Sequence, residues 1–143
     1  MRFFARDAAE RIGTPEGRID WNLRLAAYED HLDRLEGRIP DRVWELGRLD
    51  LHDALIVGVK HSGHEVSISL NTLACAMDAV AATLHFLDVQ QSCVPATSVG
   101  AFWLYEEIDV SPLGGFRLDV LLDTDEIMIV AADVRVELVF GLP

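Results

Sequence analysis

Two short runs of the sequence place carboxylates where the surrounding pattern predicts buried positions. One run spans residues 49–54, Leu-Asp-Leu-His-Asp-Ala, and the other spans residues 103–108, Trp-Leu-Tyr-Glu-Glu-Ile. Asp53 has the parity of the apolar residues that follow it, and Glu106 falls among apolar residues at alternate positions. A lone buried carboxylate is costly unless it is paired, hydrogen-bonded or protonated. Because general acid–base catalysis uses carboxyl groups with perturbed pKa values, Asp53 and Glu106 are candidate site residues.

Four further side chains complete this candidate set. Trp103, Tyr105 and Glu107 alternate with the apolar positions of their run, so we expect them on the opposite face of the strand, where the two aromatic rings could cover a shallow surface. His52 precedes Asp53 directly. In a regular strand these two neighbours point to opposite faces and could not both bind one metal ion.

The same carboxylates also have purely structural interpretations. Asp53 lies near the start of a strand, where its side chain could accept hydrogen bonds from backbone N–H groups and close a turn. Glu106 could pair with an arginine, or a bulge at Glu106 and Glu107 could turn it outward. Both interpretations stay open at the level of the sequence.

Other motifs of catalysis or metal binding are weak. His61 and His64 flank a Ser-Gly pair, which indicates a hairpin tip, whereas a zinc site needs three or four converging ligands. Residues 123–126 lack the glycine and the distant glutamate of a calcium loop. No serine stands in a nucleophile motif, and Gly114-Gly115 indicates a turn. We therefore expect no cofactor and no metal, and assign no catalytic residue.

The first third of the chain has the period of a helix. Apolar side chains recur at alternating steps of four and three, at Trp21, Leu25, Tyr28, Leu32, Leu35 and Ile39. Asp20 could cap the start of this helix and Gly37 could end it. A second, short helix is expected from Pro40 to Gly47.

Beyond residue 48 the period changes to two, which predicts strands. Residues 55–59 and 66–70 form a hairpin around residues 62–64, and further strands are expected at 80–89, 102–110 and 116–122. Residues 90–100 are expected to form a loop. After residues 127–131 the inward set changes parity at Asp133 and continues at Val134, Val136, Leu138 and Phe140, which requires a bulge or bend.

These patterns predict an α+β fold. N-terminal helices would pack on a largely antiparallel sheet of about six or seven strands, with neighbouring strands pairing in sequence order. Residues 1–143 would form a single domain, helical over 1–48 and rich in strands over 49–143.

The charge balance excludes some classes of partner. The formal net charge is −12, and Lys60 is the single lysine. Nucleic acids and anionic membrane surfaces are bound by clusters of Lys and Arg, so neither is expected as a partner. An acidic surface steers association with a basic protein. Two cysteines without a framework, and the lack of a signal peptide or a long apolar run, predict a cytoplasmic protein.

Three features together resemble a group of small, uncharacterised bacterial domains. They are the Phe3-Phe4 opening, the Leu51-His52-Asp53 strand start, and the later run of Trp103 with Tyr105-Glu106-Glu107-Ile108. Some domains of this kind act as immunity or accessory proteins beside bacterial toxins. The resemblance implies such a role here and assigns no catalytic residue.

Three functional hypotheses follow. The first is a non-catalytic interaction module, immunity-like or accessory, that meets a basic protein. The second is a small enzyme or a ligand- or metal-binding domain that uses His52, Asp53 and Glu106. The third is a homo-oligomer built on the helix stripe or on exposed Trp103 and Tyr105.

Overall fold

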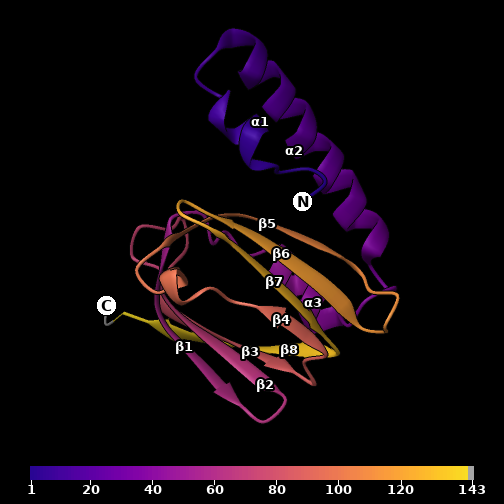
Figure 1. Ribbon diagram of the computed structural model, residues 1–143, viewed down its shortest axis with the longest axis vertical. Coiled ribbons are helices and arrows are strands. Elements are labelled where there is room, and N and C mark those ends of the chain that lie inside the picture. Colours follow the sequence, from indigo (N-terminus) through magenta and orange to yellow (C-terminus); the bar gives the residue numbers. More distant parts are fainter. Residues whose placement is uncertain (142–143) are drawn as a thin grey trace.

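The computed structural model describes residues 1–141, and it has three α-helices, one 3-10 turn and eight strands (Figure 1). The helices are α1 (Arg6–Glu10), α2 (Pro15–Leu35) and α3 (Asp41–Gly47), and the 3-10 turn is η1 (Ala96–Ser98). The strands are β1 (Ala54–Ser62), β2 (Glu65–Asn71), β3 (Ala79–Leu87), β4 (Gln91–Cys93), β5 (Phe102–Val110), β6 (Phe116–Leu122), β7 (Glu126–Ala131) and β8 (Asp133–Phe140). The α+β class is confirmed, and the sheet has more strands than expected. Among the described helices, none is both long and apolar enough to cross a membrane.

Helix α2 begins earlier than the sequence pattern indicated. Thr14 caps it by accepting a hydrogen bond from Gly17 N, and Pro15 occupies the first helical position. Asp20, which we expected at the cap, lies inside the helix and pairs with Arg24 at 2.8 Å. The apolar stripe begins at Trp21, so it did not mark residues 15–20, where the buried residue is Gly17 and has no side chain to show the period. Helix α1 was also missed, because five residues are too few to show a period.

All seven strand pairings are antiparallel, in the order β4-β7-β6-β5-β1-β2-β3-β8. Two meanders, β1-β2-β3 and β5-β6-β7, pair in sequence order as expected. Three other pairings do not, because β1 pairs with β5, β3 pairs with β8 and β4 pairs with β7. The interval 90–100 is also not all loop, since β4 pairs with β7 at that edge of the sheet.

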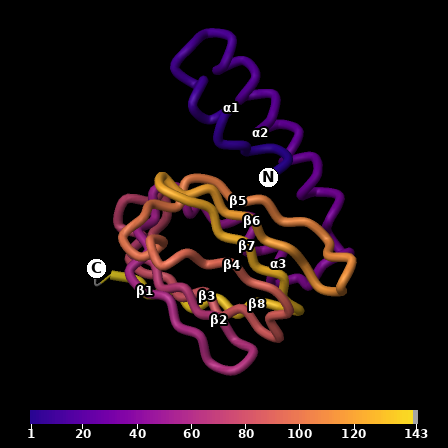
Figure 2. Tube along the Cα trace, viewed as in Figure 1, coloured from indigo at the N-terminus to yellow at the C-terminus, as the bar shows by residue number. Residues whose placement is uncertain are grey.

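The sheet curls on itself. Figures 1 and 2 show β5, β6 and β7 on one side and β1, β2, β3 and β8 on the other. The rings of Phe86 on β3 and Phe116 on β6 lie 6.3 Å apart, although three strands separate β3 from β6 in the sheet order. Helix α3 contacts both β5 and β8 and contributes buried Val43 and Leu46. The core therefore fills the space that the curled sheet and α3 enclose.

A bulge corrects the expected facing of β1. The register shifts between Ile56 and Gly58. Ala54 and Ile56 are fully buried, whereas Val57 is 52% exposed, so the inward residues at the start of β1 are the even ones. Asp53 consequently does not share a buried face with its neighbours, as the uninterrupted alternation had suggested.

A second bulge reverses the start of β5. The register shifts between Trp103 and Tyr105, so Trp103 is fully buried and Phe102 is 43% exposed, the opposite of what we expected. Beyond the bulge the expected parity holds, and Glu106 lies opposite buried Val120 on the inward face. A bulge adds one residue to one strand, and no residue type in the run marks its place.

The expected change of face near Asp133 is confirmed as a bend between two separate strands. Val134 is buried on β8, which turns away from β7 to pair with β3. Phe140 is 62% exposed, so it does not join the inward set as expected. It is the last residue of β8, the outermost strand at this edge of the sheet.

Candidate functional site

One edge of β5 is covered by side chains in place of a strand. β6 pairs along the opposite edge, but β1 reaches β5 only at Phe102 and Trp103. Farther along, the Leu104 carbonyl accepts a hydrogen bond from His52 Nδ1 at 2.6 Å. Ile108 N donates to the Tyr28 hydroxyl at 2.9 Å, and Ile108 O accepts from His31 Nε2 at 3.0 Å. These bonds satisfy backbone N–H and C=O groups on this edge of β5, which no neighbouring strand pairs.

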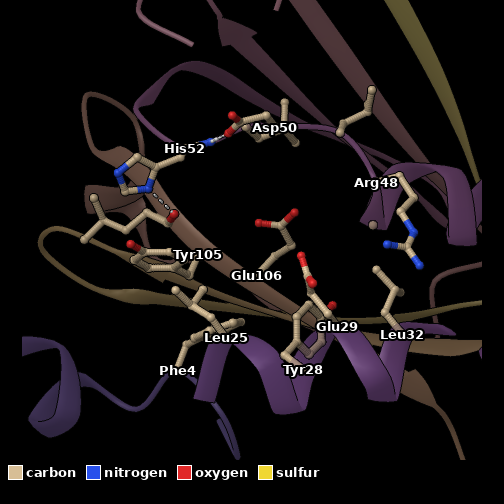
Figure 3. Close-up of a pocket in the computed structure, with 14 residues that line it drawn as sticks. Phe4, Leu25, Tyr28, Glu29, Leu32, Arg48, Asp50, His52, Tyr105 and Glu106 are labelled. Atoms are coloured by element: carbon tan, nitrogen blue, oxygen red, sulfur yellow. Dashed lines mark hydrogen bonds between the residues drawn. The ribbon is translucent and has the colours of Figure 1, made fainter. Parts of the chain in front are cut away.

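A pocket of about 400 Å³ opens at this edge (Figure 3). Its walls come from α2, from the segment that joins α3 to β1, and from β5. Leu25, Leu32 and Leu51 give it apolar surface. The polar groups are contributed mainly by Glu29, Arg48, Asp50, His52, Tyr105 and Glu106.

Glu106 is the central ionisable group of the pocket. Figure 3 shows its carboxylate between the side chains of Asp50 and Glu29. Loss of water around Glu106 raises its pKa to about 7, and the negative charge of Asp50 acts in the same direction. A hydrogen bond of 3.0 Å from Trp103 Nε1 to Glu106 Oε2, together with His52, opposes this rise. Glu106 is therefore only partly ionised near neutral pH.

The pocket supplies Glu106 with no free arginine. Arg48 lines the pocket, but its guanidinium forms an ion pair with Asp33 and lies 4.8 Å from the centre of the Trp44 ring. The arginine pairing that we considered for Glu106 from the sequence is thus not formed. Trp103, which we expected to face outward, lies beneath Glu106 and supplies the indole N–H.

An aromatic cluster holds one wall of the pocket. The Tyr105 ring stacks on Phe4 with centroids 5.1 Å apart, and it meets the edge of Trp21 at 4.9 Å. The His52 ring lies 4.9 Å from the same tyrosine. Because a backbone carbonyl only accepts, Nδ1 of His52 carries a proton, and this fixes the ring against the pocket. The wall is thus positioned before any ligand arrives.

Glu107 has a structural role instead. Its carboxylate accepts hydrogen bonds from three successive backbone amides, those of Arg2, Phe3 and Phe4. These bonds attach the start of the chain to β5, and Phe4 is 2% exposed in consequence. With its acceptors already used, Glu107 does not line the pocket.

Asp53 is also outside the residues that line the pocket. Its backbone adopts a positive φ of 72°, and its amide donates to Trp103 O at 2.8 Å. The Asp53 side chain is 53% exposed, and its carboxylate lies 3.6 Å from His52 Nε2. Of the six candidate residues, the structure brings His52, Tyr105 and Glu106 into one pocket and leaves Asp53, Trp103 and Glu107 outside its lining.

Sequence reasoning missed four polar residues of the pocket, and one of them, Arg48, belongs to no motif in the sequence. Asp50 stands in the same run as His52 and could have been found from that proximity. Tyr28 belongs to the apolar stripe of α2, and its hydroxyl had no signal of its own. Glu29 is one of many acids on the helix, and nothing in the sequence separates it from the others.

The side chains do not assemble a metal centre in the part of the chain that the structure describes, since no three His, Cys, Asp or Glu side chains lie close enough together there to hold a metal ion. The arrangement offers instead a desolvated carboxyl group, an oriented histidine and aromatic walls around an open space. Such a site can accept hydrogen bonds from a ligand and can stabilise a positive charge.

Comparisons with known proteins place the chain in a family without assigning it an activity. No curated protein matches it, and no solved structure matches it. One family model covers most of the chain, and it agrees with the expectation of an uncharacterised domain. The chain belongs to the family described as Protein of unknown function (DUF4085), whose model matches residues 17–131.

Proposed function

We propose that this protein is an interaction module for a basic protein, and that the Glu106 pocket binds a cationic side chain of that partner. One observation carries the proposal. Glu106 is desolvated enough to raise its pKa to about 7, yet it faces an open pocket and is bonded to a neutral indole instead of a cation. An entering guanidinium or ammonium group would supply the missing positive charge.

The walls of the pocket suit such a group. The carboxylates of Glu29 and Asp50 lie near Glu106, and the apolar surface of Leu25 and Leu32 can contact an aliphatic stem. Arginine fits better than lysine, because its guanidinium is more weakly hydrated and stacks on aromatic rings such as Tyr105.

The charge of the whole chain supports the same partner. A net charge of −12 attracts basic proteins over a distance and accelerates their encounter at low salt. The immunity-like or accessory role that the resemblance implies is of this kind, and we expect it to operate in the cytoplasm.

The proposal is tested with short peptides that differ at one position. We expect a peptide with a central arginine to shift NMR signals of His52 and Tyr105, and a matched peptide with citrulline to bind at least about ten-fold more weakly. Binding should tighten from pH 6 to pH 8, because a cation prefers the ionised form of Glu106. Near pH 6.5 binding should release a proton from Glu106, which calorimetry in buffers of different ionisation enthalpy would detect.

A matched pair of variants completes the test. Glu106→Gln should weaken arginine binding about ten-fold or more and remove its pH dependence. Glu126→Gln, an exposed acid outside the pocket, should change neither. Equal binding of arginine and citrulline peptides, or unchanged binding by Glu106→Gln, would contradict the proposal.

A second candidate function is general acid–base catalysis in the same pocket. The observation that favours it is again the pKa of Glu106, since a group near 7 is present in both protonation states at neutral pH. His52 lies beside it, whereas Asp53, which we had grouped with them, does not line the pocket. We expect the protein to turn over a simple acyl, glycosyl or phosphoryl substrate. The rate should change with pH around an apparent pKa near 7, and this change should disappear in Glu106→Gln. Absence of turnover across these classes would dismiss this candidate.

A further inference from the structure

A second group of reactive side chains lies on the outer face of the sheet, across β2, β3 and β8. Ser67 on β2 is directly opposite His85 on β3. Glu137 on β8 is opposite Thr83, two residues before His85 on β3. These residues alternate with core residues such as Ile68 and Leu84, so they point away from the interior. They are independent of the Glu106 pocket, which none of them lines.

The contacts between these three side chains form a chain. Ser67 Oγ lies 2.9 Å from His85 Nδ1, and His85 Nε2 lies 3.4 Å from Glu137 Oε1. The His85 side chain is only 17% exposed, and its Nε2 atom is buried and makes no hydrogen bond within the described part of the chain, so the 3.4 Å approach to Glu137 is an electrostatic contact. The same oxygen, Glu137 Oε1, accepts a hydrogen bond from Arg135 Nη1 at 2.6 Å.

The hydrogen-bonding rules fix the roles of these atoms. The negative charge of Glu137, 3.4 Å from Nε2, favours the tautomer of neutral His85 that carries its proton on Nε2. Nδ1 then presents a lone pair to the hydroxyl of Ser67, which donates to it. A serine that donates to a histidine with a carboxylate close to its other nitrogen resembles the arrangement that activates a hydroxyl for nucleophilic attack.

Space for a substrate exists beside the serine. A hollow of about 350 Å³ on this face is lined by Ser67 and His85 together with small polar residues such as Ser69 and Thr83. Gly58 lies opposite Ser69 in the register, and its missing side chain leaves this part of the face low. Lys60 is directly opposite Ser67.

The same residues supply donors for developing negative charge. Lys60, Ser69 and Thr83 line the hollow together with Ser67. Polar side chains around a reacting centre can stabilise an oxyanion when backbone amides are engaged elsewhere, as they are within a sheet. The single lysine of the chain thus lines the hollow that Ser67 also lines.

We propose that Ser67 is the nucleophile of a hydrolytic site for small carboxylic esters, with His85 as its base and Glu137 as a positioning residue. Ser67 Oγ forms a bond to the ester carbonyl carbon while its proton moves to His85 Nδ1. The ester C–O bond then breaks, and this proton leaves with the alcohol. Water, deprotonated by His85, attacks the acyl-serine, releases the carboxylic acid and restores Ser67.

A fluorophosphonate probe tests the nucleophile directly. Attack by Ser67 forms a P–O bond and expels fluoride, so intact-protein mass spectrometry should show one adduct, and peptide mapping should place it on Ser67. Ser67→Ala should abolish the adduct, whereas Ser92→Ala, which changes an exposed serine of β4 that does not line the hollow, should label within two-fold of wild type. His85→Gln should slow labelling about 100-fold or more.

Glu137 requires a readout beyond folding. Glu137→Gln should slow labelling about ten-fold, and Glu137→Asp should restore part of the rate, while both keep the wild-type melting temperature. Wild-type protein should also hydrolyse p-nitrophenyl acetate, and Ser67→Ala should not. Glu106→Gln should label like wild type, which separates this site from the proposed function. Absence of an adduct on Ser67, or equal labelling of Ser67→Ala and wild type, would overturn the proposal.

Discussion

Two neighbouring glutamates of β5 meet opposite environments. Glu107 is satisfied by three backbone amides, whereas Glu106 has one indole N–H and a pocket from which water is partly excluded. Adjacent residues of a strand face opposite sides, so this difference follows from position and not from residue type. The sequence predicted the inward face for Glu106 correctly, but it gave no sign that the amides of Phe3 and Phe4 would reach Glu107, because those bonds join segments that are distant in the chain.

The first prediction concerns the pH dependence of stability. The pKa of Glu106 is about 7 in the folded protein and has the ordinary value of 4.5 in the unfolded chain. Between these two pH values the folded protein keeps a proton on Glu106 that the unfolded chain has released. The free energy of unfolding should therefore fall as pH rises through this window, by up to about 3 kcal/mol from this group. Glu106→Gln should remove that part of the decline and be more stable than wild type at pH 8, as measured by urea unfolding at pH 5 and pH 8. A constant difference between the two proteins at both pH values would contradict it.

The second prediction concerns Glu107. Glu107→Ala leaves three backbone N–H groups without their acceptor, and we expect it to lower the free energy of unfolding by about 2 kcal/mol or more. Amide exchange of Phe3 and Phe4, followed by NMR, should accelerate in the same variant. Glu107→Gln keeps one acceptor oxygen and serves as the control, with a smaller loss. Unchanged exchange in Glu107→Ala would show that other contacts hold this segment.

At the scale of elements, bulges decided which sequence predictions failed. The periods located α2, α3 and seven strand segments, because an apolar stripe or an alternation is the direct imprint of packing on one side. The bulges in β1 and β5 each reversed a set of side chains, which moved Asp53 out of the candidate site and Trp103 into the core. The alternation on either side of a bulge looks regular, so the reversal could not be read from it.

The third prediction tests the junction between α1 and α2. A Cβ added to Gly17 would lie 1.7 Å from Arg11 O, which is a backbone atom and cannot move aside cheaply. Gly17→Ala should therefore lower the free energy of unfolding by about 2 kcal/mol or more. Gly13 has nothing within 4 Å of such a Cβ, so Gly13→Ala should stay within about 0.5 kcal/mol of wild type. Equal thermal and urea unfolding of the two variants would contradict this packing.

At the scale of the whole molecule, charge should limit stability. The net charge is −12 on 143 residues, and the negative side chains repel one another more strongly in the compact state than in the unfolded chain. Raising NaCl from about 0.01 M to about 1 M shortens the screening distance from roughly 30 Å to 3 Å. We expect the free energy of unfolding to rise with this change, measured by urea titration at pH 8, with sucrose at equal osmolality as the uncharged control. A decrease with salt would show that attractive ion pairs dominate.

The overall class of the fold was predictable, but the order of its strands was not. Composition and period are local properties, and they predicted helices followed by an antiparallel sheet. The pairings of β1 with β5 and of β3 with β8 depend on how the two meanders meet in space, which no local pattern encodes. The pocket at the edge of β5 exists because the β1 pairing there is short, so its lining was only partly recoverable from the sequence. Trp103 is buried and thus unavailable for the assembly surface we had considered, and the homo-oligomer stays a prediction.

The short pairing between β1 and β5 also has a consequence for how the chain reaches its native state. Each meander can form from its own turns, since its partner strands are close in sequence. The pairing of β1 with β5 must instead close a long loop for only two paired positions, and the longer pairing of β3 with β8 also joins segments that are distant in the chain. The loop entropy is lost before many contacts compensate for it, so we expect two early-formed hairpin units and a late docking step, on the order of milliseconds to seconds. In such a pathway the edge of β5 that bears Glu106 is among the last surfaces to be completed. The pocket therefore forms only in the final docking step.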